Sequence, residues 1–141
     1  MRDLDIAKKR LNENGLTLSI VKNGEMVFET TLRGVSGFLE AVEKFRNKLE
    51  GASVADRIVG KAIALLCVYT KVKAIYAKIL SKNAKEVLEG NTIYHEWKFL
   101  VENILCANKT ELCPFEKIAL KISNPKDAYE KLKAQQVSMR H

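Results

Sequence analysis

The chain has 141 residues, of which 47% are hydrophobic and 29% charged, and it carries a formal net charge of +7 at pH 7. This length predicts one domain that can bury a core without disulfides or metals, and the composition excludes an intrinsically disordered chain. Because the basic residues are spread over all the predicted helices, the charge predicts weak attraction to polyanions and does not favour nucleic acid as the partner.

The first predicted elements are a helix over residues 3–13 and a β-hairpin over residues 16–32. The helix has apolar residues every three or four positions, whereas the hairpin alternates apolar and polar residues on both sides of an Asn-Gly pair. Asn-Gly tolerates the positive φ angles of a two-residue type I′ turn, and this turn sets Lys22 opposite Glu25 in a favourable cross-strand pair.

Two helices and a strand are predicted for the middle of the chain. A stripe of apolar residues indicates a helix over residues 36–49. Residues 51–70, GASVADRIVGKAIALLCVYT, are interpreted as a second helix whose later half is apolar on nearly every side. Residues 72–80 are apolar on both faces, which is typical of a central strand with helices above and below it.

The last third of the chain is predicted to contain several short helices and one edge strand. In chain order these are a helix over 82–89 capped by Ser81, an edge strand over 92–99, a short helical piece over 100–106, a helix that starts at Pro114, and a helix that starts at Pro125 behind its cap Asn124. Residues 136–141 are expected to form a frayed tail.

This order of elements predicts a single α/β domain over residues 1–141. An antiparallel hairpin followed by strands that alternate with helices is typical of a three-layer α/β/α sandwich with a mixed sheet. We expect about four strands, namely the two strands of the hairpin and two further ones.

Cysteine content and hydropathy bear on the compartment. Cys67, Cys106 and Cys113 are an odd number of cysteines without a Cys-x-x-Cys pair, and the charged start of the chain does not resemble a secretory signal. No apolar run is long enough to cross a membrane. We therefore expect a cytoplasmic protein with reduced thiols and no membrane partner, whereas its oligomeric state is not predicted.

Five stretches in chain order carry a resemblance to a known family: KNGE at 22–25, RGV at 33–35, GASVADRIVGKAIALL at 51–66, KVKAIYAKILS at 71–81 and CPFEKIAL at 113–120. Over roughly residues 15–122 the chain resembles an uncharacterised bacterial and archaeal domain-of-unknown-function family that is assigned to the cytidine-deaminase-like fold. The resemblance implies that fold, with a pocket at the start of the helix expected for residues 51–70.

The zinc ligands of true deaminases are missing from the matching positions. Deaminases of this fold carry His-x-Glu at the start of that helix and Pro-Cys-x-x-Cys at the start of the next one. Here the first position is Val54-Ala55-Asp56, which keeps only a carboxylate, and the second is the segment 82–86, which has no cysteine. The resemblance therefore implies no zinc deamination, and we expect no metal and no cofactor.

Asp56 and Lys61 are candidate site residues, each with a structural alternative. Asp56 follows Ser53 by three residues, which is the spacing of a helix capping box, but it also lies where the fold has its pocket. Lys61 follows Arg57 by one helical turn, so the two could form an anion-binding pair or a solvated helix edge. Ser53 could either cap the helix or offer its backbone N–H to an anion.

Three further candidates lie at the ends of predicted strands and at a helix start. Arg33 and Gly34 follow the second hairpin strand, and Ser81 follows the next central strand, where ligands of open α/β sheets bind. Ordinary turn chemistry explains all three equally well. Cys113 precedes Pro114 at a helix start that favours a thiolate, but no base is placed near it, so an inert cysteine is the alternative.

The leading functional hypothesis is a domain without zinc chemistry that binds a small anionic or nucleotide-like ligand through Arg33, Gly34, Ser53, Asp56, Lys61 and Ser81. One alternative is an enzyme that uses Cys113 as the nucleophile with Asp56 or Lys61 assisting it. The other is an interaction module that binds nucleic acid or protein through its basic surface. The sequence does not decide whether any reaction is catalysed.

We predict that the purified protein contains no tightly bound zinc, because Val54, Asn83 and Glu86 fill the ligand positions. Elemental analysis after dialysis measures this directly. A stoichiometric zinc ion that survives dialysis would contradict both the prediction and the inferred loss of deaminase chemistry.

Overall fold

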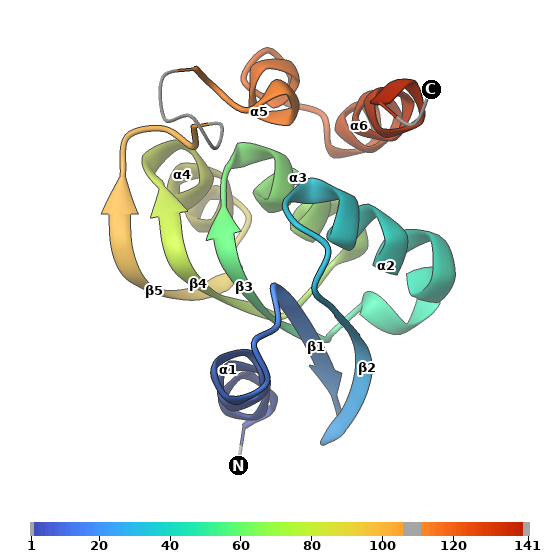
Figure 1. Cartoon of the computed structure of the whole chain (residues 1–141), viewed down its shortest axis with the longest axis vertical. Helices are drawn as coiled ribbons and strands as arrows, with labels where there is room; N and C mark the ends of the chain where they lie inside the picture. The colour runs from blue at the N-terminus through green and yellow to red at the C-terminus, as the bar shows by residue number, and fades with distance from the viewer. Residues whose placement is uncertain (1, 106–110, 140–141) are drawn as a thin grey trace.

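A mixed five-stranded sheet lies at the centre of the molecule, with strand order β2-β1-β3-β4-β5 (Figure 1). The computed structural model describes residues 2–105 and 111–139. The elements are α1 (Asp3–Glu13), β1 (Leu18–Lys22), β2 (Glu25–Thr30), α2 (Val35–Leu49), β3 (Ser53–Val59), α3 (Lys61–Thr70), β4 (Ala74–Ser81), α4 (Lys82–Gly90), β5 (Tyr94–Val101), α5 (Pro114–Ala119) and α6 (Pro125–Met139). The predicted α/β sandwich with a mixed sheet is confirmed, with five strands in place of about four.

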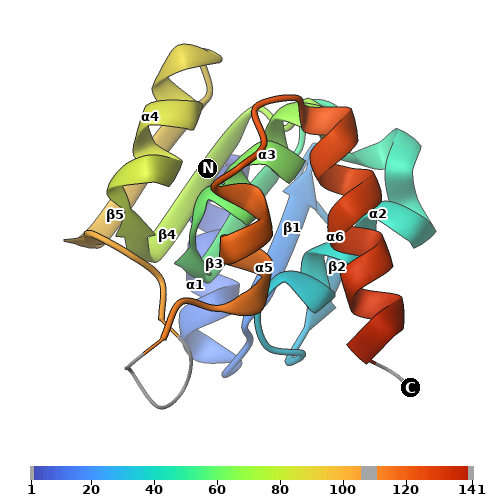
Figure 2. The same ribbon diagram turned by 90° about the horizontal axis from the view of Figure 1, so that it is seen from above.

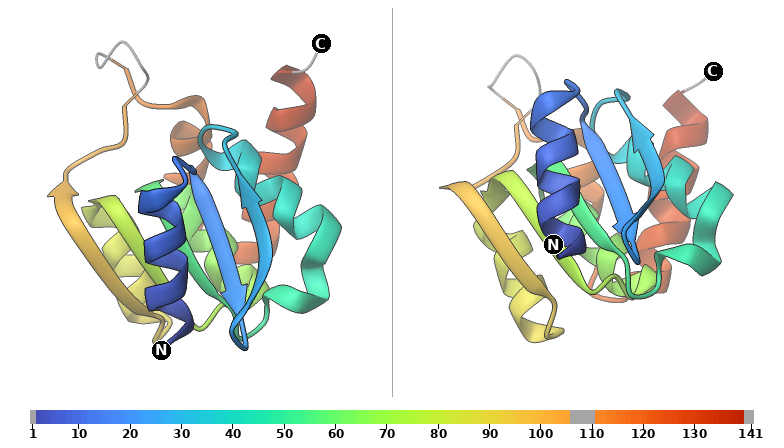
Figure 3. Two further views of the ribbon diagram at one scale, coloured as in Figure 1. Left: turned by 60° about the horizontal axis from the view of Figure 1, so that its bottom comes forward. Right: turned by 90° about the horizontal axis from the view of Figure 1, so that it is seen from below.

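Helices cover both faces of the sheet. α1 packs alone on one face, against β1, β3 and β4, whereas α2, α3 and α4 pack on the other (Figure 3). α5 and α6 lie outside α3 as a further layer (Figure 2). β3, β4 and β5 run parallel, and β1 runs antiparallel to both β2 and β3. As a result, β2 points the same way as β3, and the carboxyl ends of both strands lie at the same end of the sheet.

The hairpin has the predicted turn and register. Asn23 and Gly24 have φ angles of 54° and 80°, and Lys22 lies opposite Glu25. Asp3 strengthens the turn from outside the hairpin, because its carboxylate accepts hydrogen bonds from the N–H groups of Asn23 and Gly24 at 2.9 and 2.8 Å. The start of α1 is thereby attached to the end of the hairpin.

The interpretation of residues 51–70 as one helix is wrong. Residues 53–59 form the central strand β3, and the helix α3 begins only at Lys61. Both segments are buried on nearly all sides, and a short buried strand has the same continuous apolar pattern as a buried helix. Ser53 starts a strand and lies beside Ala74, so Ser53 and Asp56 do not form a capping box.

Two smaller expectations near the C-terminus are also corrected. β5 continues to Val101, and residues 102–105 contain no helix, so the helical piece expected over 100–106 is wrong as far as the structure describes it. α6 continues through residue 139, and buried Gln136 donates a hydrogen bond to the Ser36 carbonyl at 3.3 Å. Residues 136–139 are therefore helical, and the last two residues of the expected tail lie outside the described part of the chain.

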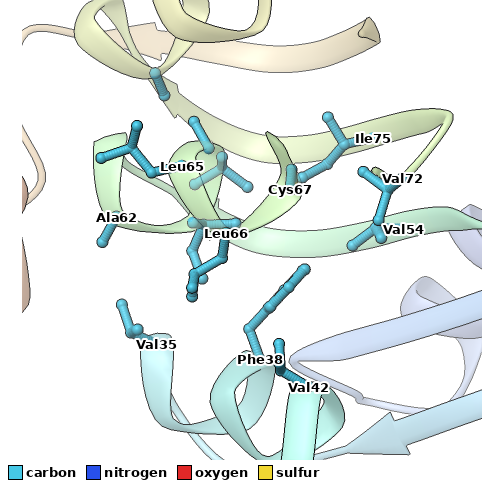
Figure 4. Close-up of a cluster of buried hydrophobic side chains, with 14 of the residues drawn as sticks. Val35, Phe38, Val42, Val54, Ala62, Leu65, Leu66, Cys67, Val72 and Ile75 are labelled. Carbon is cyan, nitrogen blue, oxygen red and sulfur yellow. The ribbon is translucent and has the colours of Figure 1, made fainter. Parts of the chain in front are cut away.

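The main core lies between the sheet and the layer of α2, α3 and α4. Phe38 of α2 and Leu66 of α3 meet Val54 and Ile75 of the two central strands (Figure 4). A second, smaller cluster lies under α1, where apolar side chains of this helix contact Tyr76 of β4. The predicted apolar stripe of α2 and both faces of β4 contribute to these clusters, together with the apolar side chains of α3.

A carboxylate from α5 caps the start of α3. Buried Glu116 accepts hydrogen bonds from the backbone N–H groups of Lys61 and Ala62 at 3.0 and 2.8 Å. These groups have no partner within the helix, and the positive end of the helix dipole favours a negative charge there. A Cβ atom at Gly60 would overlap the Glu116 carboxyl group, so glycine provides the space that this contact needs.

We predict that Glu116→Ala lowers the free energy of unfolding by about 1–3 kcal/mol, because two buried N–H groups lose their acceptor. Gly60→Ala should lower it by a similar amount by displacing the carboxylate, and the double variant should lose less than the sum of both. Urea unfolding followed by circular dichroism measures all three. The matched control is Glu130→Ala on the exposed side of α6. Additive effects, or a Glu116 variant as stable as the control, would contradict the capping role.

Candidate functional site

A pocket of about 360 Å³ lies at the carboxyl end of β3, and we call it the β3-end pocket. It is lined by Thr17, Arg33, Gly34, Asp56, Arg57 and Ile58. These residues come from the residue just before β1, the loop between β2 and α2, and β3. The structure therefore brings together Arg33, Gly34 and Asp56 of the predicted site, whereas Ser53, Lys61 and Ser81 do not line this pocket.

The ladder between β1 and β3 explains why a pocket forms here. β1 begins at Leu18, which lies opposite Asp56, so the strand β3 extends beyond the start of its neighbour. Thr17 makes the last contact between the two strands, because its carbonyl accepts a hydrogen bond from the Arg57 N–H at 3.2 Å. Its hydroxyl lies 2.6 Å from the carbonyl of Leu32 and donates to the loop after β2. The loop that carries Arg33 is thus attached to the edge of β3.

Asp56 is the buried acid of the β3-end pocket. Its cross-strand neighbours Leu18 and Ala77 belong to the main core, and its side chain is 6% exposed. Burial raises the pKa of Asp56 to about 7, partly opposed by the backbone N–H groups of Ile58 and Arg57. The Ile58 N–H donates to one carboxylate oxygen at 3.2 Å. Within the described part of the chain, no ion pair forms with Asp56.

Positive charge surrounds the mouth of the same pocket. Gly34 has a φ of 67° and precedes α2, a helix of 15 residues whose first turn holds no acidic residue and no side-chain cap. Arg33 is exposed beside it. Arg57 extends from β3, and its Nε donates a hydrogen bond to the carbonyl of Leu16. Two arginines and the glycine that precedes α2 therefore line the same pocket as the buried Asp56.

Ser81 lies at the same end of the sheet, where it is the last residue of β4, but it caps α4. Its hydroxyl accepts a hydrogen bond from the Ala84 N–H at 3.1 Å, and the side chain is buried. The prediction that Ser81 caps this helix is confirmed. Because the cap occupies its oxygen, the Ser81 side chain has a structural partner without any ligand.

Lys61 and Ser53 lie away from the β3-end pocket. Lys61 is the first residue of α3, and its Nζ lies 3.4 Å from the Leu120 carbonyl, to which it donates. The expected pair of Lys61 with Arg57 on one helix face is wrong, because Arg57 belongs to a strand. Ser53 starts β3 and lies about 10 Å from Asp56 along the strand. It lines a different pocket, at the amino end of β3.

The described cysteines differ in exposure. Cys67 is buried in α3, and burial raises the pKa of its thiol. Cys113 is half-buried at the start of α5, as predicted, and its side chain makes no capping hydrogen bond there. His95 is half-buried on β5, and its Nδ1 lies 2.8 Å from the Ile93 carbonyl. Cys106 lies outside the described residues.

The role of Glu116 could not be identified from the sequence, because its partners Lys61 and Ala62 lie far away in the chain. Sequence reasoning also missed Thr17, for which no local signal exists, because its contacts depend on the pairing of β1 with β3. No group of three or more His, Cys, Asp or Glu side chains within residues 2–105 and 111–139 is placed to hold a metal ion. No helix in that part of the chain is long and apolar enough to cross a membrane.

The model of a family described as "Domain of unknown function (DUF1893)" matches residues 6–135. The chain belongs to the DUF1893 family. A DUF1893 family protein of known crystal structure, TM1506 from Thermotoga maritima, is 27% identical to this chain in sequence. Its structure superposes on this one with a TM-score of 0.87. The match covers 96% of this chain and 91% of that one. The predicted resemblance to a family of unknown function is therefore confirmed.

A more distant similarity links this DUF1893 protein to RibD of Acinetobacter baumannii. The two are 14% identical with a TM-score of 0.49, over 86% of this chain and 38% of that one. At this distance the similarity supports no statement about activity. No curated protein matches the chain.

We predict that Asp56 makes the protein less stable as the pH rises. A carboxyl group whose pKa is raised on folding stabilises the folded state fully below its unfolded pKa, and this contribution is lost as the pH rises through the folded value. Between about pH 5 and about pH 8 the loss should be about 2–3 kcal/mol. Asp56→Asn should remove this pH dependence.

Urea unfolding of both proteins at each pH measures the effect. As the pH rises, the wild type should lose stability relative to the Asn variant. A constant difference across this range would mean that Asp56 has an ordinary pKa in the folded protein.

Proposed function

We propose that this DUF1893 domain binds a small nucleotide-like anion in the β3-end pocket. The observation that carries the proposal is the Asp56 carboxyl group, which is buried and lines a pocket that also holds two arginines. A ligand that satisfies both ends must carry a negative charge at one end and hydrogen-bond donors at the other.

The mouth of the pocket is suited to the anionic end. Guanidinium groups bind phosphate oxygens in pairs, and the first turn of a helix offers unpaired N–H groups. Arg33, Arg57 and the start of α2 provide both kinds of donor next to one another. A phosphate is the simplest group with enough acceptor oxygens to use them.

The inner wall of the pocket is suited to an uncharged group with N–H donors. A carboxylate accepts hydrogen bonds at both oxygens, and the pKa of Asp56, about 7, lets it exist in either protonation state near neutral pH. Guanine presents a ring N–H and an amino group side by side. The volume of about 360 Å³ lies in the range of small-molecule pockets.

The two alternatives have less support. Cys113 does not line the β3-end pocket, so the proposed nucleophile and Asp56 do not share a site. The basic residues are spread along the sequence and are not gathered in one long run, which gives no particular support to a nucleic-acid surface. We therefore propose binding and assign no reaction.

Binding is tested by isothermal titration calorimetry with guanosine monophosphate, cytidine monophosphate and inorganic phosphate. Guanosine monophosphate should bind more tightly than phosphate alone. Arg33→Ala should weaken nucleotide binding at least about tenfold, equivalent to about 1.4 kcal/mol. Asp56→Asn should reduce the preference for the guanine base and leave phosphate binding intact.

Arg46→Ala is the matched control, because it removes an exposed arginine from the other end of α2. It should bind guanosine monophosphate as the wild type does. The proposal is overturned if no nucleotide binds, or if the Arg33 and Arg46 variants bind equally well.

A further inference from the structure

Among residues 2–105 and 111–139, no strand pairs with the outer side of β5. β5 is the outermost strand, and β4 is its neighbour on the other side (Figure 1). Four of its eight residues are large apolar side chains with 39–51% exposure: Tyr94, Trp97, Phe99 and Leu100. An edge of this length without proline can accept another strand, and proteins usually protect such edges.

The side chains of β5 alternate between the two faces of the sheet. Glu96 lies on the face of α1, where it forms ion pairs with Lys8 at 3.5 Å and Arg2 at 3.7 Å. Trp97 lies on the face of α4, where the Nζ of Lys85 is 5.3 Å from the centre of its ring. No described carboxylate forms an ion pair with Lys98, the other charged residue of the strand.

The sequence of β5 is complementary to itself when it is reversed about Trp97. In an antiparallel pair related by a two-fold axis, residues opposite each other point to the same face. With Trp97 at the centre, Glu96 of each copy lies opposite Lys98 of the other. Tyr94 then lies opposite Leu100, and His95 opposite Phe99.

Other registers lose this complementarity. Side chains alternate in direction, so the two strands can slide past each other only by an even number of residues if their faces are to stay matched. The smallest such slide, by two residues, moves the centre of the pair by one position. If the pair is centred on Glu96, the two Glu96 carboxylates lie opposite each other. If it is centred on Lys98, the two Lys98 ammonium groups do. Like charges directly opposite each other destabilise a strand pair, so one register is favoured.

From this arrangement we propose that β5 pairs with β5 of a second copy of this chain, antiparallel and centred on Trp97, to form one continuous sheet across a homodimer. The pairing satisfies the free backbone groups of the edge and covers exposed aromatic side chains. The self-complementary charges point to a second copy, because an unrelated strand would not require this symmetry. The dimer is independent of the ligand proposed for the β3-end pocket.

The proposal is tested by charge reversal and mixing. Lys98→Glu and Glu96→Lys each place like charges opposite each other at two points, so each variant should be monomeric in sedimentation velocity at concentrations where the wild type dimerises. Mixed in equal amounts, the two variants should form a heterodimer, because every opposed pair is then of opposite charge. Lys131→Glu on the exposed side of α6 is the matched control and should dimerise normally.

Trp97 gives an independent readout, because it is the only tryptophan of the chain. Its quenching by acrylamide should fall as the wild-type concentration rises, and it should not change in either single variant. Circular dichroism checks that the variants fold. A wild type that stays monomeric over about a hundred-fold concentration range, or a dimer that survives in both single variants, overturns the proposal.

Discussion

The contact of the Glu116 carboxylate with the first turn of α3 determines how the C-terminal part of the molecule is placed. It joins residues that lie 55 positions apart in the sequence, and it is buried. Burial raises the pKa of Glu116, while the N–H groups of Ala62 and Lys61 oppose this rise. Because Gly60 leaves space for the carboxylate, the chain can turn from strand to helix directly beneath α5. This close approach fixes the start of α5 against α3, and apolar side chains of α5 and α6 such as Phe115 and Leu132 then pack into the main core.

The candidate site depends on a different constraint, which is the length of β1 relative to β3. If β1 began two residues earlier, it would cover Arg57 and Ile58 and close the β3-end pocket. Instead the contact with β3 ends at Thr17, whose carbonyl accepts a hydrogen bond from the Arg57 N–H and whose hydroxyl donates to the Leu32 carbonyl in the loop after β2. A buried acid in the middle of a sheet is costly, and its position beside an open pocket is typical of binding sites.

Local signals in the sequence were sufficient for much of the fold. The Asn-Gly turn, the stripe of α2, the two buried faces of β4 and the Ser81 cap each depend on residues close together in the chain. The boundary at Gly60 could not be found in this way, because a buried strand and a buried helix share an apolar pattern. The same error produced the false capping box of Ser53 and Asp56. Arg33, Gly34 and Asp56 do line one pocket. The strand-end rule predicts this position for Arg33 and Gly34, whereas Asp56 was expected at a helix start and lies within β3.

The strand order β2-β1-β3-β4-β5 has a consequence for how the chain acquires its structure during synthesis. After the hairpin, β3 is added beside β1, and β4 and β5 are each added beside the strand made before them, so the sheet grows in one direction only. No strand has to be inserted between two that are already paired. The N-terminal hairpin with α1 can therefore provide a template while the rest of the chain is still on the ribosome. α5 and α6 emerge last and close over a sheet that is already complete.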